Sequence, residues 1–122
     1  GRGGGGGGGE AGQGGHAAGF DPAQVCRDQH GSRWVQRRFE AAAPGERARL
    51  FEALLPHAPG LMTDVFGNYV VQKLFDYGDA EQRARLAAAT VRGRVAPLAA
   101  HAYGCRVVQR ALGALAGGGG GG

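Results

Sequence analysis

Three short stretches of the chain place a glutamine four residues after a small or polar residue, with a planar side chain directly after that first residue. The stretches read HGSRWVQRRF, FGNYVVQKLF and YGCRVVQRAL. The residues concerned are Ser32, Arg33 and Gln36, then Asn68, Tyr69 and Gln72, then Cys105, Arg106 and Gln109. At about 100° per residue, each triplet shares one face of a helix, and the apolar side chains lie roughly opposite.

The chemistry of such a triplet suits a nucleobase. Its first and third residues carry hydrogen-bonding groups one helical turn apart, where both can meet the edge of one base. The residue between them is Arg or Tyr, whose flat group can stack on a base. Repeated in register, this arrangement predicts a surface that reads single-stranded RNA one base at a time.

The triplets recur at a regular period. The glycines that precede them, Gly31, Gly67 and Gly104, are 36 and then 37 residues apart, which indicates an array of repeats. Helical patterns begin at Pro44 and Asp79, and short helical pieces (PGLMTDVF, RVAPLAAHA) precede the second and third glycines. No stretch alternates as a strand does. We predict an all-α solenoid with about three helices per repeat.

Other residues recur around the triplets. We expect the glycines to serve the helix junctions, and the side chains before them, His30, Phe66 and Tyr103, to pack there. A cation follows each glutamine: Arg37, Lys73 and Arg110. These cations could contact phosphate, or they could simply form a solvated helix face.

Composition bounds the folded part of the chain. Of the 122 residues, 26 are Gly, and most of these lie at the two ends. We expect residues 1–19 and 116–122 to be disordered Gly-rich segments, and residues 20–115 to form one small domain. The net charge is +4, and thirteen of the fourteen basic residues are Arg. This favours a nucleic-acid partner, although a nucleotide bias of the gene could also enrich Arg.

Several classes of protein are not indicated. Cys26 and Cys105 lie far apart and form neither a disulfide framework nor a zinc motif, which is typical of a reducing compartment. The four His residues have no metal-ligand spacing, and no catalytic constellation or cofactor site is visible. No apolar run is long enough to span a membrane. We expect a cytoplasmic, monomeric protein that is not an enzyme.

The triplet stretches resemble the RNA-binding helices of Pumilio (PUF) repeats. The resemblance covers residues 24–112, with HGSRWVQRRF similar to the first repeat and LMTDVFGNYVVQK to the second. It implies a curved α-solenoid that binds RNA antiparallel on its concave face. The family's code then implies adenine for the first triplet, uracil for the second and adenine for the third, a partial site 5′-AUA-3′. The implied function is binding of mRNA 3′ untranslated regions to repress translation or promote decay, with protein co-repressors as further partners.

The family's domain normally has eight repeats, whereas this chain resembles about two and a half. We expect the third repeat to stop near Leu112, leaving Val107, Val108 and Leu112 uncovered, and the chain to be a fragment of a longer Pumilio-like protein. Two alternatives stay open: a helical-repeat scaffold that binds protein, as armadillo and HEAT arrays do, or a fragment without function.

Overall fold

The computed structural model describes residues 21–118, which contain helices and no strand. The elements are α1 (Pro22–Val25), α2 (Gln29–Ala41), α3 (Pro44–Leu54), the 3₁₀ helix η2 (Leu55–His57), α4 (Ala58–Leu61), α5 (Gly67–Tyr77), α6 (Ala80–Thr90), α7 (Val95–Ala99) and α8 (Gly104–Gly118). The predicted all-α class is therefore confirmed. The predicted Gly-rich segment 1–19 lies outside the described residues, as do residues 119–122.

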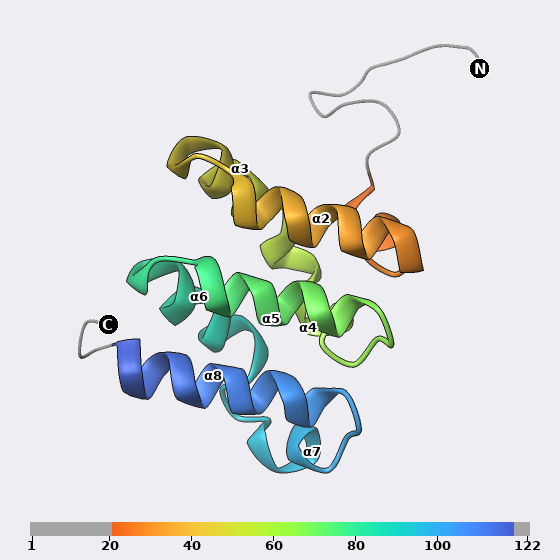
Figure 1. The fold of residues 1–122 in the computed structure, drawn as a ribbon. Coiled ribbons are helices and arrows are strands. Elements are labelled where there is room, and N and C mark those ends of the chain that lie inside the picture. The colour runs from red at the N-terminus through yellow and green to blue at the C-terminus, as the bar shows by residue number, and fades with distance from the viewer. Residues whose placement is uncertain (1–20, 119–122) are drawn as a thin grey trace.

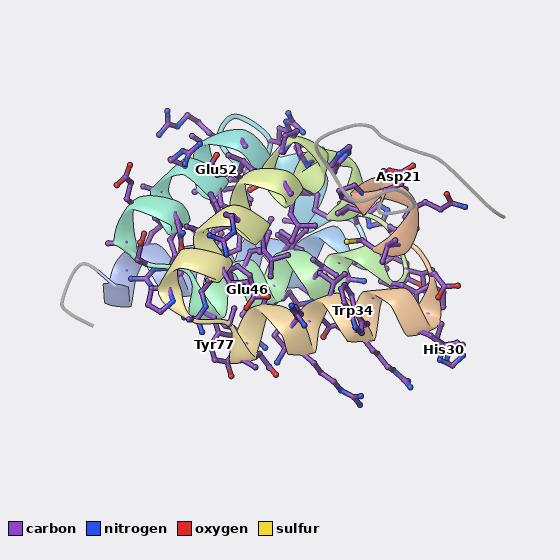
Figure 2. All side chains as sticks on the ribbon, turned by 90° about the horizontal axis from the view of Figure 1, so that it is seen from above. Asp21, His30, Trp34, Glu46, Glu52 and Tyr77 are labelled. Atoms are coloured by element: carbon purple, nitrogen blue, oxygen red, sulfur yellow. The ribbon has the colours of Figure 1, made fainter. Side chains whose placement is uncertain are left out.

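The helices form stacked units in two layers. Helices α2, α5 and α8, which we call the front helices, lie side by side in one layer, with α3 and α6 behind them (Figure 1). Seen from above, His30 and Trp34 lie on α2 in the front layer and Glu52 lies in the layer behind (Figure 2). Each unit begins with a short helix, α1, α4 or α7, followed by its front helix. This is the predicted solenoid of three-helix repeats.

Each front helix is capped by the side chain three residues before its glycine. Asp28 accepts hydrogen bonds from the backbone N–H groups of His30 and Gly31, at 3.0 and 2.8 Å. Asp64 caps α5 in the same way, at 2.9 and 2.7 Å. In the third unit His101 Nδ1 takes this place, accepting at 3.0 and 3.1 Å. These bonds satisfy N–H groups that the first turn of a helix leaves without a partner.

The three glycines allow the short helix of each unit to pass close to the front helix. A Cβ added at Gly31, Gly67 or Gly104 would lie only 2.3, 3.0 or 3.0 Å from the carbonyl oxygen six residues earlier. At Gly67 it would also lie 2.8 Å from Leu61 Cδ2. The glycines therefore serve the helix junctions, as predicted. Of the side chains expected to pack there, Phe66 and Tyr103 are half-buried, whereas the prediction is wrong for His30, which is exposed on the first of the described units.

The other predicted helix starts are also confirmed. Pro44 lies in the first turn of α3, where its missing N–H costs nothing. Asp79 and Gln82 form a reciprocal capping box at α6, with bonds of 2.8 and 2.9 Å. At the other end of α2, Arg47 donates to the carbonyl oxygens of Phe39 and Glu40, at 3.0 and 2.9 Å.

An apolar core runs between the layers and through all three units. Its largest buried side chains are Phe39, Phe51, Phe75, Leu54, Leu61, Met62, Leu74 and Leu86. Removal of apolar surface from water stabilises a fold by roughly 25 cal/mol per Å² and is the dominant favourable term here. The core therefore holds the units in one register.

The C-terminal end of the array differs from the prediction in two ways. Val107 and Val108 are buried rather than uncovered, because α5, α6 and α7 all pack on α8. Leu112 does remain exposed, at 54%. Helix α8 also continues to Gly118, whereas we predict a Gly-rich segment from residue 116 onward. Extending an existing helix adds one hydrogen bond per residue without a new nucleus, and the hydrogen bonding carries past Leu115 into the first glycines.

Ion pairs link neighbouring units along the front layer. Lys73 bonds Glu40 of the preceding unit, and Arg110 bonds Asp76 with a 2.7 Å contact to Oδ1. The hydrogen bond to Glu40 raises the pKa of Lys73. Partly exposed pairs of this kind contribute about 0–1 kcal/mol each, so they help to set the register more than they stabilise it.

These pairs give two of the three cations that follow a glutamine a role that the sequence did not predict. Lys73 and Arg110 each form an ion pair with the preceding unit, whereas Arg37, on the first unit, is exposed and forms no ion pair within residues 21–118.

None of the helices in the described part of the chain is long and apolar enough to cross a membrane.

We expect Gly67→Ala to lower the free energy of unfolding by roughly 1–3 kcal/mol, because the added methyl group forces α4 and α5 apart. Gly113→Ala is the matched control on α8, where an added Cβ meets nothing within 4 Å. It should raise stability by up to about 1 kcal/mol through helix propensity alone. Urea unfolding followed by far-UV circular dichroism measures both changes. Shifts of the same sign in the two variants would contradict this account of the junction.

Candidate nucleic-acid interface

The three predicted triplets lie on the three front helices, in the same turn of each unit. The first is on α2, the second on α5 and the third on α8. Because these helices lie side by side (Figure 1), the triplets form one row across the molecule. Gln36, Gln72 and Gln109 are therefore on a common face rather than in unrelated positions.

Within each of the first two triplets, the two hydrogen-bonding side chains are in contact with each other. Gln36 Nε2 donates to Ser32 Oγ at 3.2 Å, and Gln72 Nε2 donates to Asn68 Oδ1 at 2.9 Å. A spacing of four residues places the two side chains one above the other on a helix, which explains both contacts. In each pair the two polar side chains therefore meet at one place on the helix.

The side chains of these two pairs are more buried than a helical wheel suggests. Asn68 is fully buried, and its Nδ2 donates to the carbonyl oxygens of Asp64 and Val65 at 2.8 and 3.0 Å. Ser32 is 2% exposed and Gln72 is 9% exposed. Gln36 is half-buried. A wheel gives the direction of a side chain but not how far the neighbouring unit covers it.

The third triplet is arranged differently. Cys105 Sγ donates to the carbonyl oxygen of Ala102 at 3.4 Å, and Gln109 is exposed. Within the described residues no hydrogen bond joins Cys105 to Gln109. A thiol is a weak donor and acceptor, so it does not hold the glutamine as Ser32 or Asn68 does.

The planar members of the triplets, Arg33, Tyr69 and Arg106, are exposed along the row. Arg106 Nη1 donates to the Tyr69 hydroxyl oxygen at 2.8 Å. Arg106 Cζ also lies 5.8 Å from the ring centroid of Tyr69 and 5.8 Å from that of Tyr103. The second and third planar groups are therefore in direct contact across the unit boundary.

A pocket with a volume of about 370 Å³ opens between the first and second units. Its lining residues are Gln29, Ser32, Arg33, Gln36, Val65, Phe66 and Tyr69. It combines flat groups with a polar edge, which suits a planar ligand that carries hydrogen-bonding groups. The sequence prediction missed Gln29 and Val65 as lining residues. Their place one turn before a triplet is the signal that could have found them.

Within residues 21–118 no three His, Cys, Asp or Glu side chains come close enough together to hold a metal ion. Burial raises the pKa of the Cys26 thiol to about 12. Cys26 lies in the core behind the front layer, so it has no part in the interface.

The repeats match a known family. The model of the Pumilio-family RNA binding repeat matches residues 23–55, 57–89 and 94–114. The chain belongs to the Pumilio family. The third Pumilio match is shorter than the first two, in agreement with the predicted partial third repeat.

Curated relatives support this assignment. Pumilio homolog 1 of Xenopus laevis is 52% identical over 89 residues, which cover 73% of this chain and 7% of the relative. The mRNA-binding protein puf3 of Schizosaccharomyces pombe is 42% identical over 69 residues, 56% of this chain and 9% of the relative. The chain thus spans only a small part of the Pumilio proteins that it matches.

Solved structures of the family share the fold. The Puf3 RNA binding domain bound to the Cox17 RNA 3′ UTR recognition sequence, site A, is similar with a TM-score of 0.70 and 38% identity. The match covers 75% of this chain and 26% of that domain. PUF-8 in complex with PBE-RNA gives a TM-score of 0.67 and 35% identity, over 78% of this chain and 30% of the other.

We expect the two thiols to react at very different rates with a thiol reagent such as DTNB. Only the thiolate is nucleophilic, so the buried Cys26, with its raised pKa, should react only when the protein unfolds. Cys105, partly exposed on the front face, should react in the native state. The absorbance of released thionitrobenzoate should show one fast thiol, and Cys105→Ser should remove it. Two fast thiols in the native protein would contradict the burial of Cys26.

Proposed function

We propose that this chain binds single-stranded RNA in a sequence-specific manner along the front helices, without catalysis. The observation that carries the proposal is the in-register row of triplets on α2, α5 and α8, in two of which the polar side chains are paired by a hydrogen bond. RNA readers of this kind hold unstacked bases by their edges and stack them on planar side chains. The open pocket between the first two units has both features.

Each triplet takes a defined role in this proposal. The edge-contacting pairs are Ser32 with Gln36 for adenine, Asn68 with Gln72 for uracil, and Cys105 with Gln109 for adenine. The stacking groups are Arg33, Tyr69 and Arg106. Read antiparallel to the chain, the partial site is 5′-AUA-3′. Three stacked bases at about 1–3 kcal/mol each, less the cost of ordering the RNA, give weak binding from these repeats alone.

The biological target follows from the relatives. The Puf3 and Puf4 domains were solved with 3′ UTR recognition sequences, which supports an mRNA 3′ untranslated region as the ligand of this chain. Its role would be repression of translation or control of mRNA stability in the cytoplasm, with co-repressor proteins recruited to the bound message.

We expect Gln36→Ala to remove selectivity at the last base of the site. The wild-type chain should prefer RNA ending in AUA to RNA ending in AUC by about tenfold, since a lost base contact is worth roughly 1–1.5 kcal/mol. In the variant the two affinities should converge. Fluorescence anisotropy with short labelled RNAs measures them. Gln24→Ala, on the exposed surface of α1, is the control and should keep the preference. Equal binding of both RNAs by the wild-type chain would remove the base assignment.

We also expect binding to weaken with salt. Each phosphate neutralised on a single strand contributes about −0.7 to the slope of log K against log salt concentration. The exposed Arg37 is the candidate phosphate contact. Arg37→Ala should therefore weaken all RNAs alike and make the slope less steep. A protein-binding scaffold would show little binding of any oligonucleotide at any salt concentration.

A further inference from the structure

The two gaps between neighbouring planar groups differ in this structure. Between Arg33 and Tyr69 lies the open pocket of about 370 Å³. Between Tyr69 and Arg106 the planar groups are joined by the 2.8 Å hydrogen bond to the Tyr69 hydroxyl. We call the first gap slot one and the second gap slot two.

Slot two is too narrow for a base. A flat ring between two planar groups needs two van der Waals contacts of 3.5–4.0 Å, a separation of about 7 Å. Arg106 Cζ lies 5.8 Å from the Tyr69 ring centroid. A second ring, that of Tyr103, lies 5.8 Å from the same carbon on Arg106. Arg106 is thus held in place by a hydrogen bond and two aromatic rings.

The polar edge of slot two is also covered. Asn68 is fully buried and Gln72 is 9% exposed; in slot one Ser32 is 2% exposed, and only Gln36 is half-buried. The main difference therefore lies in the planar groups: slot one is an open pocket, whereas the contact between Arg106 and Tyr69 closes slot two.

We propose that Arg106 is a latch on slot two, which the base must displace from the Tyr69 hydroxyl before it can stack and be read. This inference rests on the proposed RNA function and adds to it an unequal pair of sites. The base at the 3′ end of the site enters a preformed pocket, whereas the central base opens its own. The free energy needed to open slot two lowers the affinity for every RNA that places a base there.

Tyr69→Phe tests the latch, because it keeps the stacking ring and removes only the hydroxyl acceptor. An exposed hydrogen bond of this type is worth about 0.5–1.5 kcal/mol. The variant should therefore bind AUA-containing RNA about two- to tenfold more tightly than the wild-type chain. Tyr103→Phe is the matched control, because its ring faces Arg106 at the same 5.8 Å but its hydroxyl bonds no described residue. It should leave the affinity unchanged. Unchanged or weaker binding by Tyr69→Phe would overturn the latch.

RNAs with an abasic nucleotide assign the effect to one slot. With the central base removed, nothing enters slot two, so Tyr69→Phe and wild type should bind equally. With the 3′ base removed, Tyr69→Phe should still bind the RNA more tightly than the wild-type chain does. A gain that survives loss of the central base would show that the hydroxyl acts elsewhere, and would also overturn the proposal.

The free protein gives a readout that does not depend on RNA. Nuclear magnetic resonance of the Arg side chains should show slowed rotation and hydrogen exchange at Arg106 relative to Arg33, and Tyr69→Phe should abolish the difference. Equal hydrogen exchange at the side chains of Arg106 and Arg33 would overturn the latch, even if the chain binds RNA. Conversely, a slowed Arg106 in a chain that does not distinguish AUA from AUC would leave the latch standing and remove only the proposed function.

Discussion

The close backbone approach at the glycine of each unit is the constraint on which the rest of the structure depends. A Cβ at Gly31 would collide with the carbonyl oxygen six residues earlier, and a Cβ at Gly67 or Gly104 would lie unusually close to the equivalent oxygen. This contact fixes the angle between the short helix and the front helix within a unit. Because it recurs at the same place in each unit, every front helix leaves its junction in the same direction, and the polar triplets fall into one row.

Stacking of the units then depends mainly on apolar burial. The buried core side chains, such as Phe39, Phe51 and Phe75, stabilise the stack far more than the partly exposed ion pairs do. The pairs Lys73–Glu40 and Arg110–Asp76 occupy equivalent places in successive units, so they favour one register over others. Affinity for a ligand is a separate matter, since it depends on side chains that project from this frame.

The arrangement of the helices could be predicted from the sequence, but the burial of the site residues could not. Period and helix starts were predictable because glycine, proline and capping residues act locally, within a few positions of Gly67 or Asp79. The burial of Asn68 and the contact between Tyr69 and Arg106 were not, since both depend on the distance between units, which no single helix encodes. The same reason explains why Val107 and Val108 are covered by helices that precede them in the chain. The ion pairs Lys73–Glu40 and Arg110–Asp76 were not predicted either, because they join side chains of neighbouring units, 33 and 34 positions apart in the chain.

The replacement of aspartate by His101 at the third cap changes the electrostatic field along the front layer. The amino end of a helix carries a partial positive charge, and a carboxylate placed there, as at α2 and α5, cancels much of it. The His101 imidazole that caps α8 accepts its two bonds at Nδ1 and brings no carboxylate to this helix end, and the first turn of α8 has no acidic residue. The partial positive charge at the amino end of α8 is therefore not offset by a carboxylate, unlike that of α2 and α5. An anionic group placed near Gly104 would meet this unshielded helix end.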